Sequence, residues 1–249
     1  LTKEQVRAIF EAPIHDPETK NLCLLRLRNK ALSILMIANG WHVHDAKRLM
    51  DSDVEDFPDY RDRDKTHRPK MLFRGRKCKE HILVHNTVGC GCLGPHSIAN
   101  TNCFYNVLKW YSQVKERSDQ HFCKTATKLM SKKQRKPHFD DDGSLKERQF
   151  FRSHPKKKTK MVYPHRNQGL HSIQGVLEFW NKELNLSETP LTTNQARKTF
   201  ATFGHKHTAV FLEIETYRKR IPSAVLLHFP WEALMAVTHH NNPSTFVGI

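Results

Sequence analysis

Apolar residues recur at helical spacing between residues 24 and 38, and this pattern constrains the fold more than any other feature of the sequence. The apolar positions are Leu24, Leu27, Ala31, Leu32 and Leu35. They fall on one side of an α-helix, so the segment is predicted to form a buried helix that runs to Ala38. Gly40 is predicted to end it, because glycine adopts the left-handed conformation common at helix C-termini without strain.

Local patterns predict further elements along the chain. Thr2 and Gln5 have the spacing of a capping box, which predicts a first helix with Val6, Ile9 and Phe10 on one face. A β-hairpin is predicted by two short apolar runs around a basic turn, residues 71–73 and 82–84. Further helices are expected at residues 43–50, near 105–111, at 173–185, at 197–203 with Thr192 or Thr193 as cap, at 230–237 and from Asn242. The sequence therefore predicts a mainly α fold with a small β-hairpin or sheet, an α+β class.

The charge balance restricts the class of partner. The chain carries 41 Lys and Arg against 25 Asp and Glu, which gives a formal net charge of +16 and a pI near 9.7. This excess favours a polyanionic partner, although a basic protein without such a partner can have the same composition. With 38% hydrophobic residues, the 249 residues can bury one substantial core, so a single domain is expected.

The sequence has no apolar run long enough to cross a bilayer, and no signal-peptide pattern opens it. A soluble intracellular protein without a membrane partner is therefore expected, nuclear in a eukaryote and cytoplasmic otherwise. In that setting, disulfides between the six cysteines are not expected.

Cysteine and histidine residues gather in one stretch that also contains Gly and Pro. The candidate metal ligands are Cys90, Cys92, His96 and Cys103. Other soft ligands just upstream are Cys78, His81 and His85. Structural zinc requires four such ligands in a tetrahedron, but this spacing matches no common zinc finger. The stretch is interpreted either as a structural zinc site or as an ordinary loop with free cysteines, and no other cofactor is expected.

The segment 112–160 changes to a strongly charged pattern. Basic clusters at 132–136 and 156–158 flank an acidic run at 140–142. The segment is interpreted as a basic, partly disordered insertion in the domain. Its basic clusters fit a nuclear-localisation signal, an arm that contacts phosphates, or a solvated surface loop.

Two segments in the C-terminal part of the sequence resemble catalytic boxes of a known family. Residues 193–202 (TNQARKTFAT) resemble the His-x-x-Arg box of tyrosine recombinases, whose Arg binds the scissile phosphate. Arg197 stands at the Arg position, and Asn194 replaces the His. Residues 238–245 (THHNNPST) resemble the segment that precedes the nucleophilic Tyr, with His240 at its His position.

Two upstream segments complete the resemblance, in the order in which the family has them. Residues 38–49 (ANGWHVHDAKRL) resemble the segment that carries the first catalytic Arg; His42 stands at the Arg position and Asp45 keeps the neighbouring acid. Residues 73–81 (FRGRKCKEH) resemble the hairpin that supplies a general-acid Lys; the residues at that position and beside it are Arg76 and Lys77. The resemblance implies the catalytic-domain fold of tyrosine recombinases over residues 1–249.

The resemblance also implies a chemistry for which this sequence lacks residues. In the family, a Tyr hydroxyl attacks a DNA phosphodiester, cations stabilise the charged oxygens, and an acid protonates the leaving 5′-oxygen. The Tyr position falls on Ile249, which has no nucleophilic atom. His42 lacks the guanidinium fork, and losing one such donor costs about 3 kcal/mol of transition-state stabilisation. Asn194 cannot exchange protons.

What remains is a set of residues that can bind duplex phosphates. The family's catalytic positions are His42, Asp45, Lys77, Asn194, Arg197 and His240. The expected DNA-binding residues are Arg48, Arg76, Lys77, Lys79, Arg197, Lys198 and His240. The expected function is a DNA-binding domain derived from a tyrosine recombinase and unable to cleave and rejoin strands. Its expected partner is double-stranded DNA. Assembly of a homo-oligomer on the DNA is compatible with the sequence.

Two other functions fit the sequence. An active recombinase or integrase of a mobile element would have its nucleophile elsewhere, at Tyr217 or beyond Ile249. A zinc-stabilised protein-interaction module would be basic without binding DNA. A covalent protein–DNA adduct would identify the first, and bound zinc without salt-sensitive DNA binding would identify the second.

Overall fold

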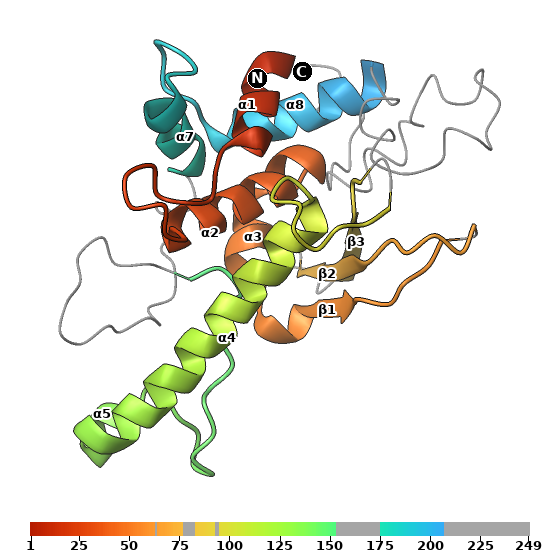
Figure 1. The fold of residues 1–249 in the computed structure, drawn as a ribbon. Coiled ribbons are helices and arrows are strands. Elements are labelled where there is room, and N and C mark those ends of the chain that lie inside the picture. Colours follow the sequence, from red (N-terminus) through yellow and green to blue (C-terminus); the bar gives the residue numbers. More distant parts are fainter. Residues whose placement is uncertain (63, 77–82, 93–94, 153–174, 207–249) are drawn as a thin grey trace.

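The computed structural model describes residues 1–62, 64–76, 83–92, 95–152 and 175–206 (Figure 1). The predicted helices at 230–237 and from Asn242 lie outside these residues, as do Lys77, Lys79, Tyr217, His240 and Ile249. Within the described ranges, no helix is long and apolar enough to span a membrane.

The fold combines helices with one small antiparallel sheet. The α-helices are α1 (Lys3–Glu11), α2 (Leu24–Ser33), α3 (Val43–Arg48), α4 (Phe104–Leu129), α5 (Lys132–Arg135), α7 (Val176–Leu184) and α8 (Thr193–Lys206). A π-helix continues α2, and a 3-10 turn leads into the sheet; they are η1 (Ile34–Ala38) and η2 (Asp51–Asp53). The strands are β1 (Val54–Phe57), β2 (Lys70–Arg76) and β3 (Leu83–Gly89). The predicted α+β class is confirmed, and β1 adds a third strand to the predicted hairpin.

Helix α2 lies at the centre of the core, as the leucine spacing predicts. Its neighbours α1, α4 and α7 all contact it (Figure 1). Leu27, Ala31 and Leu32 have no exposed surface. The helical path continues through η1 and ends before Gly40, whose φ of +66° confirms the predicted left-handed terminus.

The polar residues of α2 are buried as well, because every residue from Arg26 to Ser33 is covered. The Lys30 ammonium donates hydrogen bonds to the backbone oxygens of Ala12 at 2.9 Å and Thr101 at 3.2 Å, and to Asn102 Oδ1 at 3.3 Å. Burial lowers the pKa of Lys30 to about 8. The cation thereby ties α2 to two loops.

The sheet has the order β1-β2-β3, and both pairs are antiparallel. Side chains alternate along β2, so that Met71 and Phe73 are buried while Leu72 and Arg74 are partly exposed. The Phe73 ring packs edge-on against Trp41 at a centroid distance of 6.4 Å. One face of the sheet therefore belongs to the core.

The charged segment that begins at residue 112 forms the rest of α4, then α5 and a return loop, as far as residue 152. A small second core lies at the far end of α4, where Phe122 stacks on Phe139 at a centroid distance of 5.9 Å. Residues 153–160 lie outside the described part of the chain. The interpretation of this segment as an insertion stays a prediction.

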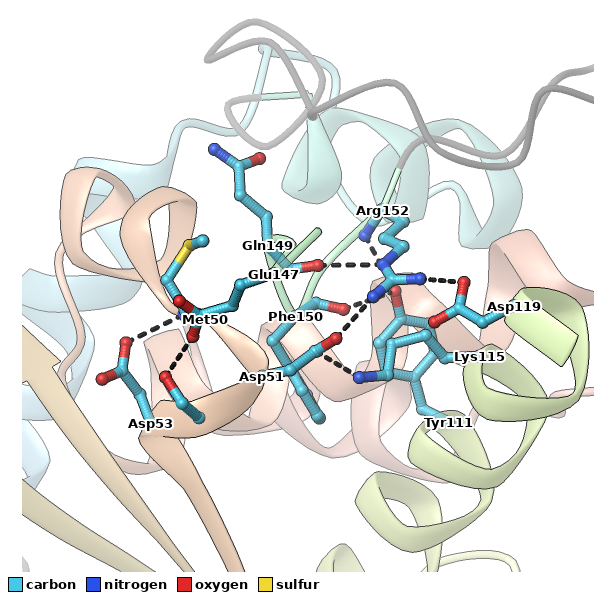
Figure 2. A network of polar contacts seen from close by, with 11 residues as sticks. Met50, Asp51, Asp53, Tyr111, Lys115, Asp119, Glu147, Gln149, Phe150 and Arg152 are labelled. Carbon is cyan, nitrogen blue, oxygen red and sulfur yellow. Dashed lines mark hydrogen bonds and ion pairs between the residues drawn. The ribbon is translucent and has the colours of Figure 1, made fainter. Parts of the chain in front are cut away.

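A polar network joins the return loop to α4 and to the start of η2 (Figure 2). The Arg152 guanidinium pairs with Asp51 at 2.5 Å and with Asp119, and Asp51 also pairs with Lys115. The backbone N–H of Arg152 donates to the Tyr111 hydroxyl at 2.9 Å. These contacts fix the loop after its backbone has paired with residues 49–51.

Helix α8 packs on η1 so closely that no Cβ fits at Gly40. A Cβ built there would lie 2.5 Å from Cδ1 of the Phe200 ring. We expect Gly40→Ala to lower the free energy of unfolding by about 2 kcal/mol, because a left-handed residue becomes strained and the Phe200 ring or α8 must also shift. Denaturant unfolding of the variant measures this.

Gly143→Ala is the matched control, because Gly143 also has a positive φ, +83°, but nothing lies within 4 Å of its added Cβ. The free energy of unfolding of this variant should fall only by the cost of a positive φ for alanine, about 1 kcal/mol. Equal losses in the two variants would mean that the contact between Gly40 and Phe200 is not a tight one.

Candidate functional site

The four predicted metal ligands come together in the fold. Their ligand atoms, three Sγ atoms and one imidazole nitrogen, all lie within 4.8 Å of one another. His96 Nδ1 is 2.8 Å from the Sγ of Cys90, 3.7 Å from that of Cys92 and 3.9 Å from that of Cys103. Tetrahedral zinc with ordinary bond lengths separates such atoms by about 3.5 Å. The cluster could therefore hold a metal ion.

Regular elements position the outer ligands of this Cys3His cluster. Cys90 follows the last residue of β3, and its N–H donates to the Pro69 carbonyl at 2.9 Å. Cys103 is the N-cap residue of α4. Both cysteines are almost fully buried. The cluster therefore joins the end of the sheet to the start of the longest helix.

Polar side chains hold the loop between these two ends. Asn106 Nδ2 donates to the carbonyls of Ser97 at 2.8 Å and Asn100 at 3.0 Å. Asn100 Nδ2 lies 3.6 Å from Cys92 Sγ, and Arg68 Nη1 donates to the Cys92 carbonyl at 2.6 Å. Such outer contacts orient ligands before a metal arrives.

The thiols influence one another strongly. The hydrogen bond from the Cys103 thiol lowers the pKa of Cys90 to about 4, and the same bond raises the pKa of Cys103. Burial raises the pKa of Cys92. One thiolate is thus favoured before a metal binds, and the other two thiols would release protons on binding.

Among the described residues, none of the other cysteines and histidines considered as ligands belongs to the cluster. Cys78 and His81 lie outside the described residues, and His85 stands in β3. Cys23 precedes α2, and Cys123 lies within α4. The ligand set predicted from the sequence is the one that the fold assembles.

A second candidate site involves Asp45 of α3 and Arg197 of α8. Asp45, in α3, is buried, and its carboxylate interacts electrostatically with the Arg197 guanidinium of α8. Burial lowers the pKa of Arg197, and Asp45 partly offsets the effect. The Nε atom of Arg197 is buried and has no hydrogen-bond partner among the described residues. We call this arrangement the α3–α8 site.

His42 lies at the start of α3 as its N-cap residue. Its Nδ1 accepts a hydrogen bond from the N–H of His44 at 3.1 Å, and the two rings stack at a centroid distance of 5.0 Å. A protonated Nδ1 could not accept this bond. The cap therefore favours an imidazole whose Nδ1 carries no proton.

The other predicted site residues are distributed as follows. Arg48, Asn194 and Lys198 are exposed on α3 and α8, near the α3–α8 site in sequence. Arg76 ends β2. Lys77, Lys79, His240 and Ile249 lie outside the described residues, so their predicted roles stay predictions.

Comparison with known proteins assigns no family. No protein-family model matches the chain, and no curated protein matches its sequence. Function is therefore inferred from the chemistry of the two sites.

Proposed function

We propose that the chain is a duplex-DNA-binding domain of the tyrosine-recombinase type, which holds backbone phosphates and does not cleave them. The observation that carries the proposal is the contact between the two segments that resemble catalytic boxes. They are far apart in sequence, yet Asp45 of one interacts with Arg197 of the other, and Gly40 packs against Phe200. A shared phosphate site requires this neighbourhood.

Arg197 is the residue we assign to the phosphate. The Asp45 carboxylate interacts electrostatically with its guanidinium, and no described residue accepts a hydrogen bond from its Nε. A guanidinium can bind a carboxylate along one edge and a phosphate along another. Partial burial strengthens such a contact, because less water screens it. The net charge of +16 would draw DNA toward the site.

Cleavage is not expected, because two of the positions that resemble catalytic ones lack the required groups. His42 uses Nδ1 to cap α3, so it replaces an Arg poorly. Asn194 is exposed on the first turn of α8 and has no titratable proton. A DNA complex without strand transfer follows from these substitutions.

We also propose that the Cys3His cluster binds zinc in a structural role. Three thiolates and one imidazole are ligands that zinc prefers, and four protein ligands leave no open position for catalysis. Such a site carries a net charge of −1, which the nearby Arg68 would offset. A zinc-stabilised protein-interaction module would contain the same site, so zinc alone does not distinguish the two functions.

Arg197→Ala is expected to raise the Kd for duplex DNA about tenfold, similarly for unrelated sequences, because a phosphate contact carries no base information. The slope of log affinity against log salt should fall in magnitude by about 0.9, the value for one phosphate contact. Fluorescence anisotropy with two random duplexes at several salt concentrations measures both quantities.

Lys182→Ala is the control, since Lys182 is an exposed cation on α7. It should leave affinity and slope unchanged. Unaltered binding by Arg197→Ala would remove the phosphate assignment. A covalent adduct with a nicked duplex would show that the protein is an active strand-transfer enzyme. Bound zinc without any salt-sensitive DNA binding would favour the interaction module.

A further inference from the structure

One face of α4 carries a row of basic side chains. Arg117, His121, Lys124 and Lys128 are all exposed, and they follow one another at intervals of four, three and four residues. At 3.6 residues per turn, these positions lie on a single stripe along the helix. We call it the α4 stripe. Among the residues between and beside its members, Gln113, Gln120 and Thr127 are exposed and uncharged.

The opposite face of α4 packs against the rest of the protein. Its buried members Tyr111, Phe122 and Ala126 contact the return loop, and Lys115 pairs with Asp51 of η2. Beyond the sheet and the central helices, α4 extends away from the body of the molecule and ends near α5 (Figure 1). The α4 stripe thus faces away from the core.

Acidic residues are also few along the described length of α4, where only Glu116 and Asp119 occur. The cations of the α4 stripe take part in no ion pair with any described residue. Residues 120–139 contain no Asp or Glu but six Lys and Arg, and the run continues into α5. Within α4, Asp119 pairs with Arg152 on the buried side, and Glu116 lies about 110° around the helix from the stripe.

Such a row is unfavourable for the isolated helix, because Lys124 and Lys128 repel each other at a spacing of four residues. An anionic partner would remove this repulsion. The acidic run 140–142 is not this anionic partner, because its segment packs through Phe139 and Leu145 on the opposite face of α4.

We propose that the α4 stripe is a second nucleic-acid contact surface, which binds the phosphates of a duplex beyond the α3–α8 site. From Arg117 to Lys128 the stripe extends about 16 Å along the axis, a length over which duplex DNA carries about ten phosphate charges. The major groove admits an α-helix, and exposed amide and hydroxyl groups beside the cations can bond to phosphates. The proposal rests on the proposed function only in its choice of duplex DNA as the polyanion.

The experiment compares two triple variants of the whole chain that lose the same three charges. The stripe variant is Arg117→Gln, Lys124→Gln and Lys128→Gln. The control variant is Lys3→Gln, Lys20→Gln and Lys182→Gln, which removes exposed cations from α1, α7 and the loop before α2. Both lower the formal net charge from +16 to +13. Circular dichroism and thermal melting check that both fold as the unmodified protein does.

We expect the stripe variant to bind a random duplex at least tenfold more weakly at about 0.1 M salt. Its salt slope should be smaller by up to about 2.7, three contacts at about 0.9 each. The control variant should stay within twofold of the unmodified protein. Equal losses in the two variants would overturn the proposal, because net charge alone would then explain the effect.

Further outcomes separate this proposal from the proposed function. Weak binding by Arg197→Ala with unchanged binding by the stripe variant would overturn the α4 surface and leave the α3–α8 site intact. The reverse pattern would support the α4 surface alone. If the stripe variant lost affinity for polyglutamate but not for duplex, the surface would be one for acidic proteins. An unmodified protein that bound no duplex would overturn both proposals.

Discussion

Removing the proposed zinc from the Cys3His cluster is expected to lower the free energy of unfolding by about 4 kcal/mol relative to protein kept at free zinc a thousand times above Kd. The reason is topological. The ligands Cys90, Cys92, His96 and Cys103 tie the end of β3 to the start of α4 through one loop. Without the metal, hydrogen bonds such as those from Asn106, Arg68 and the Cys90 N–H still hold this junction. Urea unfolding of zinc-loaded and chelator-treated protein measures the difference.

Cys103→Ser and Cys123→Ser form the decisive pair of variants. Cys103 is a proposed ligand at the N-cap of α4, whereas Cys123 is a free thiol further along the same helix. Cys103→Ser should bind less than stoichiometric zinc and lose most of the stabilisation. Cys123→Ser should keep both. Elemental analysis gives the zinc content, and cobalt substitution reports the tetrahedral thiolate environment. If the purified protein bound no zinc, or if both variants behaved alike, the cluster would be an ordinary set of free thiols.

Local sequence patterns predicted much of the fold. They also predicted all four residues of the Cys3His cluster. The capping box of Thr2 and Gln5 lies where the sequence places it, and Gly40 ends the central helical path. These features depend on residues that are neighbours in the chain, so a short pattern contains them. The metal ligands could be predicted for the same reason, since all four fall within one stretch.

Long-range features were not predictable in this way. Lys30 and Arg28 are charged, yet both are buried because neighbouring helices and loops cover this part of α2. Strand β1 is short, and its sequence does not alternate apolar and polar residues. It forms by pairing with β2. The electrostatic interaction between Asp45 and Arg197 was not predicted from the sequence, because nothing local relates α3 to α8. Tertiary contacts decide each of these cases.

The polar network around Arg152 was not predicted either, for the same reason (Figure 2). Breaking it should lower the stability of the fold substantially. Arg152 is 4% exposed and neutralises Asp51 and Asp119, which are themselves largely covered. We expect Arg152→Met to lower the free energy of unfolding by about 3 kcal/mol, because the carboxylates lose a buried partner. Denaturant unfolding of the metal-loaded protein measures this.

Arg74→Met provides the comparison, because Arg74 pairs with Glu55 at the surface of the sheet, where solvent screens the charges. It should cost less than about 1 kcal/mol. A double-mutant cycle of Arg152→Met with Asp119→Asn should give a coupling energy above about 1 kcal/mol, since the two side chains interact directly. Additive effects would mean that Arg152 stabilises the return loop through its backbone hydrogen bond to Tyr111 and its packing, with little contribution from charge.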